Sequence, residues 1–330
     1  MRPHFVLYSI LLITAYSSAF SQTPITDPRA KQACASVEQV EIPAADRPTA
    51  AEEKALAGCL SVDAYFGLGE PADPVKARKC AYAEIDRGTK SALSGKAILA
   101  MVYANGKGVA RNYDVALKMA CTIGDSPGDA AGRVYQLVRL KKENGSGESR
   151  FSICDHSSGR DLYEQCAILQ SRFDKVERDQ QLEKLTASWS ARDKKAFHAF
   201  WSEVERFAKV QASNGVDLEG TFEIQEEVFL INHVVDSLKE FENGELPKHS
   251  TDEAHTAQAA EAAAFLKTQT GTASQWGTAT RENVKKSEDE WQRYRSAWIS
   301  FGKQKYPAVT SDSWNAWLDQ ERAQTLNKLH

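Results

Sequence analysis

The fold of the chain is decided by residues 284–329, VKKSEDEWQRYRSAWISFGKQKYPAVTSDSWNAWLDQERAQTLNKL. Aromatic residues recur three and four positions apart in the first half of this stretch, which places them on one side of a helix. They are Trp291, Tyr294, Trp298 and Phe301, whereas Glu288, Arg293 and Lys303 fall elsewhere on the helix. The pair Tyr306 and Pro307 predicts the end of this helix.

A second helix is predicted after the proline turn, with Ser311 or Asp312 as its cap. Its inward positions are Trp314, Trp317, Leu318, Thr325 and Leu329. Two helices with aromatic faces and a short connection predict a packed helical hairpin. The simplest interpretation of these aromatic residues is that they form a core.

The preceding residues show the same helical periodicity. Apolar stripes with spacings of three and four occur at Leu162, Cys166, Leu169 and Phe173, at Phe197, Phe200, Trp201, Val204 and Phe207, and at Val228, Ile231, Val235 and Leu238. Glycines at 215 and 244 follow two of these helices, and Ser250 with Glu253 forms a capping box for an alanine-rich helix over residues 252–267. Since no segment alternates like a β-strand, we predict an all-α fold that ends in an antiparallel helical bundle.

The first residues are typical of a signal peptide. Arg2 precedes a short apolar run over residues 5–16, and Ala19 and Ser21 fit a small-x-small cleavage site. We therefore expect residues 1–21 to be removed and the protein to be periplasmic or secreted from a bacterium, without a membrane anchor. Residues 22–50 are expected to be a flexible leader with one short helical piece around Cys34.

Six cysteines lie between residues 34 and 166. An even number in an exported chain predicts three disulfides, and no two cysteines have the short spacing of a structural zinc site. Cys154 and Cys166 bracket a turn and are the most convincing pair. A hairpin that turns near residue 70 would bring Cys59 to Cys80, and Cys34 would then pair with Cys121.

Two segments of the first half resemble each other at an offset of about 38 residues. Leu60 to Ala81 and Leu99 to Ala120 each read as a helix, a glycine-rich turn and a second helix, with Tyr65 matching Tyr103 and Ala77 matching Ala116. The turn at Gly106 and Gly108 lacks the spacing and the preceding strand of a phosphate-binding loop. Residues 51–143 are therefore predicted to be a short helical repeat region.

A polar, glycine-containing stretch at residues 141–149 predicts a linker, and residues 151–330 are predicted to be the second domain. Without residues 1–21 the chain has 40 basic and 45 acidic residues, a net charge of −5. This mild acidity argues against a nucleic-acid-binding protein. Residues 221–265 contain ten acidic residues and two basic residues, Lys239 and Lys248, so the local net charge is −8. This negative charge favours a basic protein partner.

No constellation typical of an enzyme is present in the sequence. His249 and His255 are six residues apart, which does not suit a helical metal site, and neither a Gly-x-Ser-x-Gly nor a His-Glu-x-x-His motif occurs. Cysteines of an exported chain are expected to be oxidised, which removes the usual nucleophile. We therefore expect a protein that is not an enzyme and uses neither a metal nor a cofactor.

Residues 99–120, with Tyr103-x-x-Gly106-x-Gly108-Val109, resemble a Sel-one-like repeat, a relative of the tetratricopeptide repeat. This resemblance implies stacked helical hairpins that bind protein or peptide. The pattern Trp291-x-x-Tyr294-Arg295-x-Ala297-Trp298, followed by Trp317-Leu318 and Arg322-x-x-x-Leu326, resembles the lysozyme-inhibitor LprI-like family of secreted bacterial proteins. The likeness extends over residues 151–330, including the cysteines at 154 and 166 and residues 195–220.

The second resemblance implies an envelope binding protein, with lysozyme or another envelope protein as its partner. The candidate binding residues are Trp291, Tyr294, Arg295, Trp298 and Arg322. Arg295 is also suited to stack on Trp298 or to pair with Glu321 across the hairpin. The alternative hypothesis is a periplasmic scaffold or adaptor that binds through its repeats and has a purely structural second domain.

Overall fold

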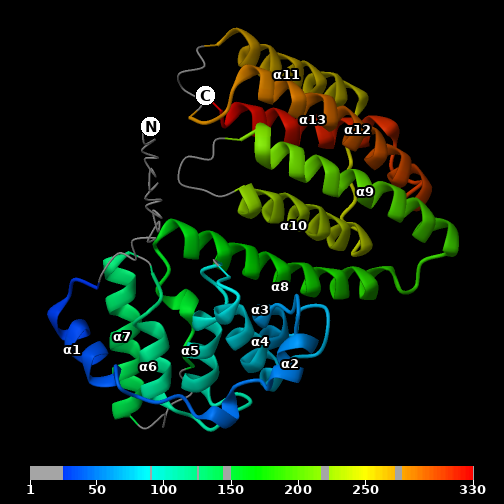
Figure 1. Ribbon diagram of the computed structural model, residues 1–330. Coiled ribbons are helices and arrows are strands. Elements are labelled where there is room, and N and C mark those ends of the chain that lie inside the picture. The colour runs from blue at the N-terminus through cyan, green and yellow to red at the C-terminus, as the bar shows by residue number, and fades with distance from the viewer. Residues whose placement is uncertain are drawn as a thin grey trace, which may run out of the picture. The chain divides into compact units, whose positions relative to one another are not determined.

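The structure of the protein is a computed structural model that describes residues 25–89, 91–124, 126–143, 150–216, 223–271 and 277–329. All regular secondary structure within these residues is helical, which confirms the predicted all-α fold (Figure 1). The chain divides into two compact units, unit 1 (Met1–Leu162) and unit 2 (Tyr163–His330). The expected signal peptide, residues 144–149 of the expected linker and residues 217–220 of the LprI-like segment lie outside the described residues.

Unit 1 is built from short helices. They are α1 (Pro28–Val37), α2 (Ala50–Ala55), α3 (Ser61–Phe66), α4 (Pro74–Asp86), α5 (Lys96–Asn105), α6 (Tyr113–Ala120) and α7 (Pro127–Lys142), with the 3-10 turns η1 (Ala44–Asp46) and η2 (Ile153–Asp155). Proline begins α1, α4 and α7. The backbone N–H that proline lacks would form no hydrogen bond within the helix at this first position. The side chains of Asp27, Asp73 and Ser126 cap these three starts.

Two helix pairs in unit 1, α3 with α4 and α5 with α6, have the helix–turn–helix form that the internal repeat predicted. The first helix of each pair ends at Gly67 or Gly106, whose φ angles of 76° and 64° favour glycine. A Cβ at Gly67 would lie only 2.9 Å from the backbone nitrogen of Ala72. The equivalent alanines, Ala77 and Ala116, are completely buried, so each pair closes over a small side chain.

Disulfides brace unit 1. Cys59 is bonded to Cys80 and Cys34 to Cys121, with Cα–Cα distances of 6.0 and 5.8 Å, and both pairings agree with the prediction. Cys154 and Cys166 are disulfide-bonded as well, so none of the six cysteines is free. Three disulfides indicate that the protein matures in an oxidising compartment, either extracellular or periplasmic.

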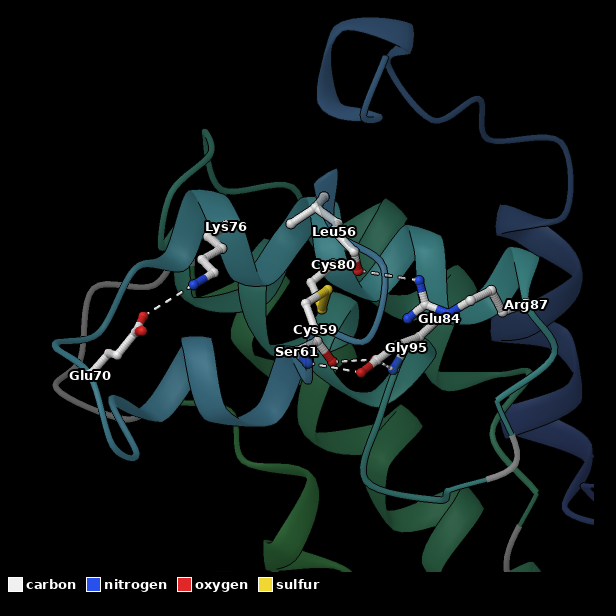
Figure 2. Close-up of a disulfide and its surroundings, with 9 residues drawn as sticks. All are labelled: Leu56, Cys59, Ser61, Glu70, Lys76, Cys80, Glu84, Arg87 and Gly95. Atoms are coloured by element: carbon white, nitrogen blue, oxygen red, sulfur yellow. Dashed lines mark hydrogen bonds and ion pairs between the residues drawn. A yellow bond between two sulfur atoms is a disulfide. The ribbon is translucent and has the colours of Figure 1, made fainter. Parts of the chain in front are cut away.

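A buried carboxylate lies beside the Cys59–Cys80 bond (Figure 2). Glu84, on α4, accepts hydrogen bonds from the backbone N–H groups of Ser61 and Gly95, each at 2.8 Å. These contacts connect the start of α3 and the start of α5 to α4. The acid thereby satisfies backbone groups that a helix start leaves without a partner.

The short helical piece predicted around Cys34 is present, but it is packed against the rest of unit 1 and is not part of a flexible leader. Residues 28–37 form α1, which packs against α6 and α7 with Ala30 and Val37 buried. Beyond the disulfide at Cys34, the Lys118 ammonium donates hydrogen bonds to the carbonyl oxygens of Glu38 and Val40, at 2.8 and 2.7 Å. The overall content of proline, aspartate and alanine suggested a flexible segment. In the structure an aspartate caps the helix, a proline starts it and an alanine packs it against its neighbours.

The boundary between the units comes later than the sequence indicated. Phe151 and Ile153, expected to open the second domain, are buried within unit 1. The side-chain amide of Asn105 exchanges two hydrogen bonds with the backbone of Phe151, each 2.9 Å long. These residues therefore complete the core around α5 before the chain enters unit 2.

Unit 2 consists of longer helices: α8 (Arg160–Thr186), α9 (Ala191–Asn214), α10 (Glu223–Glu242), α11 (Thr251–Thr270), α12 (Arg281–Lys305) and α13 (Ser311–Asn327). The predicted hairpin of α12 and α13 is present, but α12 packs mainly against α9, and α13 mainly against α11 (Figure 1). Thr310, rather than Ser311 or Asp312, caps α13 by accepting a hydrogen bond from the N–H of Ser313. The predicted capping box of Ser250 and Glu253 starts α11.

Aromatic rings form the core of unit 2. The completely buried ring of Trp298 lies 4.3 Å from the ring of Phe200 and 6.0 Å from that of Trp314, measured between centroids. Gly302 permits this packing, because a Cβ there would lie 2.5 Å from the indole of Trp314. Among the described residues, no helix combines the length and apolar character that crossing a membrane requires.

Candidate binding site

Unit 2 contains a cavity of about 190 Å³ between α9, α10, α12 and α13. Its apolar lining consists of Val204, Phe207, Ala208, Phe229, Leu230, Val234, Trp291 and Tyr294. Its polar lining consists of Gln211, His233, Glu321, Arg322, Gln324, Thr325 and Lys328. An apolar cavity of about 150 Å³ in another protein holds benzene, so this space is large enough for one ring or one branched side chain.

The apolar interior follows from the helical stripes in the sequence. Val204, Phe207 and Ala208 lie on the inner face of α9, and Trp291 and Tyr294 on the inner face of α12. The Phe207 and Tyr294 rings stack with their centroids 4.6 Å apart, which fixes the distance between the two helices at this level. The cavity is therefore walled by side chains that the core itself holds in place.

Arg322 is the charged residue of the cavity wall that is almost completely buried. Its Nε and Nη2 atoms lie 3.0 and 2.9 Å from Oε2 of Glu288, and Nη1 donates to Oε1 of Gln211 at 2.9 Å. The hydroxyl of Ser287 also donates to Gln211. Burial lowers the pKa of Arg322, and the Glu288 carboxylate opposes this shift, so the guanidinium is kept charged by its partner.

The opening of the cavity has a different character. Phe229 lines the cavity and is 64% exposed, so it belongs both to the wall and to the outer surface. Beside it, Nε2 of His233 lies 3.0 Å from Oε1 of Glu321. This hydrogen bond raises the pKa of His233 above its ordinary value. The rim thus carries an exposed aromatic ring beside a titratable pair.

Three of the five predicted binding residues line the cavity: Trp291, Tyr294 and Arg322. All three are at least 95% buried, so they are reached only from inside it and not across a flat surface. Trp298 is completely buried and does not line the cavity. The prediction that it contacts a partner is wrong, because aromatic rings pack around it: Phe200 from α9, Phe241 from α10 and Trp314 from α13.

Arg295 is a structural residue. Its Nε and Nη2 donate to the two carboxylate oxygens of Asp319 at 2.6 and 3.0 Å, a bidentate ion pair between α12 and α13. It therefore neither stacks on Trp298 nor pairs with Glu321, which the sequence had suggested. Asp319 is 3% exposed, so the carboxylate of this ion pair is almost completely removed from water.

Sequence reasoning missed Glu288 and Gln211. Glu288 was placed away from the aromatic face of α12, yet it is 8% exposed and pairs with Arg322. The signal was available in the spacing, since Glu288 is three residues before Trp291, and Gln211 is four residues after Phe207. Glu288 and Gln211 are both polar residues at positions where an apolar stripe continues. This shared feature indicated that they belong to a buried polar network.

Within the described part of the chain, no group of three or more His, Cys, Asp or Glu side chains is placed to hold a metal ion. A comparison of the chain with protein-family models, with curated proteins and with solved structures finds no match.

Proposed function

We propose that the chain is an exported, non-catalytic binding protein of the bacterial cell envelope, and that unit 2 binds a partner protein by taking one of its apolar side chains into the cavity. The observation that carries this proposal is the cavity itself, with its apolar interior and the exposed ring of Phe229 at its opening. A buried pocket that accepts a single anchor is the usual centre of a protein interface.

Two features favour a protein partner over a free small molecule. Phe229 extends the apolar surface beyond the cavity, and a small molecule held inside the cavity would leave the Phe229 ring exposed to solvent. Two basic groups of the wall, Arg322 and His233, are already engaged with Glu288 and Glu321, and Lys328 is exposed to solvent. The buried part of the cavity therefore offers apolar contact rather than a new ion pair.

Lysozyme is the first partner to test, because of the resemblance of residues 151–330 to LprI-like proteins. The acidic balance of residues 221–265 supports a basic partner, and Asp236, Glu240, Glu245 and Asp252 are exposed. Part of that balance is used internally, since Glu242 accepts hydrogen bonds from Trp189 and Tyr306 and pairs with Lys305. Attraction by the exposed acids weakens as salt rises.

The direct test is lysozyme activity on a cell-wall suspension, measured with increasing amounts of the oxidised full-length mature chain. We expect stoichiometric inhibition, weakened at least about tenfold by Phe229→Ala, because truncating an interface anchor costs more than about 1.4 kcal/mol. Leu266→Ala is the matched control, since Leu266 is 60% exposed on α11 and does not line the cavity. Absence of inhibition at large excess of folded protein would exclude the lysozymes tested.

The cavity can be tested without a partner by ¹⁹F NMR with fluorobenzene as the probe. Saturable binding is expected for the wild-type chain. Ala208→Leu, which places three more carbon atoms in the cavity wall, should abolish it while the protein stays folded. If fluorobenzene binds both proteins equally, or neither, the cavity does not accept a ring and the proposed mode of binding is wrong.

A further inference from the structure

Glu261 lies in the middle of the face through which α11 packs against the rest of unit 2. The buried residues of this face are spaced three to seven positions apart along α11, at Ala254, Ala257, Ala264 and Thr268. Glu261 takes the position between Ala257 and Ala264, on the same stripe. A carboxyl group therefore occupies a place where the helix otherwise carries only small side chains.

The charges that face Glu261 do not balance it. Ala257 packs in one cluster with Ala316 and Ala264 in another with Ala323, which places Glu261 opposite the part of α13 that carries Asp319 and Arg322. The charges of Glu288 and Arg295 on α12 act on Glu261 as well. Both cations are already paired, Arg322 with Glu288 and Arg295 with Asp319. Glu261 itself has no hydrogen bond or ion pair with another described residue. When ionised, it is a third carboxylate beside two guanidinium groups, which is unfavourable in partly buried surroundings.

The pKa of Glu261 reflects this position. Burial, and after it the charges of Glu288 and Asp319, raise the pKa of Glu261 to about 7 from 4.5, against the opposing effect of Arg322 and Arg295. The folded protein thus retains a proton that the unfolded chain releases. The stability associated with protonated Glu261 is complete below pH 4.5 and is lost as the pH rises through about 7.

We propose that Glu261 controls the cavity of unit 2 through Arg322. When protonated, Glu261 leaves Arg322 with Glu288 in the cavity wall; when ionised, it competes for the guanidinium and weakens the attachment of α11. Arg322 is the connection, since it both lines the cavity and faces Glu261. This inference rests on the proposed function, because it concerns regulation of the same cavity.

α11 is the element on which such a change acts directly. Its buried apolar residues are alanines, together with the partly buried Phe265, and alanine methyl groups bury little apolar area. Elements held by few apolar contacts open at lower free energy than the core does. The aromatic packing of α9 against α12 provides a rigid reference within the same unit.

The first test is amide hydrogen exchange of the full chain at pH 5.5 and pH 8, expressed as protection factors. In the wild type, protection of residues 251–270 should fall about tenfold at the higher pH, a value reduced from the full linkage because Glu261 is partly exposed to solvent. Glu261→Gln should remove this fall, whereas Asp252→Asn, an exposed acid on the same helix, should keep it. An equal fall in wild type and Glu261→Gln would overturn the proposal.

The second test measures the affinity for fluorobenzene at the same two pH values. We expect several-fold weaker binding at pH 8 in the wild type and no such change in Glu261→Gln. His233 also titrates in this range but is present in both proteins, so the difference between them isolates Glu261. Binding that is equal at both pH values contradicts control by Glu261, whereas no binding at either pH contradicts the cavity as a binding site.

Discussion

Unit 1 and unit 2 are both helical, but different forces hold them together. Unit 1 uses short helices of 6 to 16 residues, alanine-lined faces and two internal disulfides. Unit 2 uses helices of 17 to 27 residues, an aromatic core and buried ion pairs. The comparison shows two ways of stabilising a helical unit: in unit 1, disulfides restrict the unfolded chain, whereas unit 2 relies on the packing of large aromatic rings.

The difference can be measured separately in each unit, because all seven tryptophans lie in unit 2. Tryptophan fluorescence therefore reports the unfolding of unit 2, whereas far-UV circular dichroism reports both units. Each of the following predictions uses this contrast.

The largest effect is expected from removing the disulfide between Cys34 and Cys121. It closes a loop of 87 residues, so replacing both cysteines by serine should destabilise unit 1 by about 4–5 kcal/mol. The same change at Cys59 and Cys80, which close 21 residues, should cost about 3 kcal/mol. Urea unfolding followed by circular dichroism measures both losses. A matching loss in the fluorescence transition would show that unit 2 also depends on these bonds.

The next effect concerns the buried charges of unit 2. Arg322→Met leaves the carboxylate of Glu288 buried without its partner and should cost about 3–4 kcal/mol in the fluorescence-detected transition. Replacing Glu288 by methionine as well should recover most of this loss, because no uncompensated charge remains.

Lys175→Met is the control for the Arg322 variant. It breaks an exposed pair with Asp179 and should change stability by less than about 0.5 kcal/mol. If the double variant at Arg322 and Glu288 is no more stable than Arg322→Met, the loss comes from packing and not from charge.

The smallest effect compares the two capping boxes. Ser250→Ala removes the cap of α11 and should lower the stability of unit 2 by about 1 kcal/mol. Thr49→Ala removes the equivalent cap of α2, a helix with no buried residue, so only this helix should unfold locally while the transition of unit 1 stays unchanged. Equal losses in the two transitions would mean that α2 is part of the cooperative core.

Most helices could be predicted because apolar spacing and terminal residues specify them locally. The stripe from Phe197 to Phe207, the capping box at Ser250 and the repeat turns at Gly67 and Gly106 all lie where the sequence indicated. The short helix around Cys34 was expected, but the order of the segment that contains it was not, because its anchors, Cys121 and Lys118, are distant in the sequence.

The cavity could not be predicted, although some of its wall could. Trp291 and Tyr294 were identified as inward-facing, and Arg322 was singled out. Whether inward side chains fill the space or leave a hollow depends on the separation of four helices, here influenced by the stacked rings of Phe207 and Tyr294. Glu261 could not be singled out within the alanine-rich helix, because its surroundings are created by residues of α12 and α13.

The two disulfides within unit 1 are nested, since the bond from Cys34 to Cys121 encloses the one from Cys59 to Cys80. During synthesis from the N-terminus, Cys34 and Cys59 emerge before Cys80 and Cys121, and they are not native partners. Oxidation that is faster than chain completion therefore joins the wrong pair. The native pairing is then reached only through thiol–disulfide exchange.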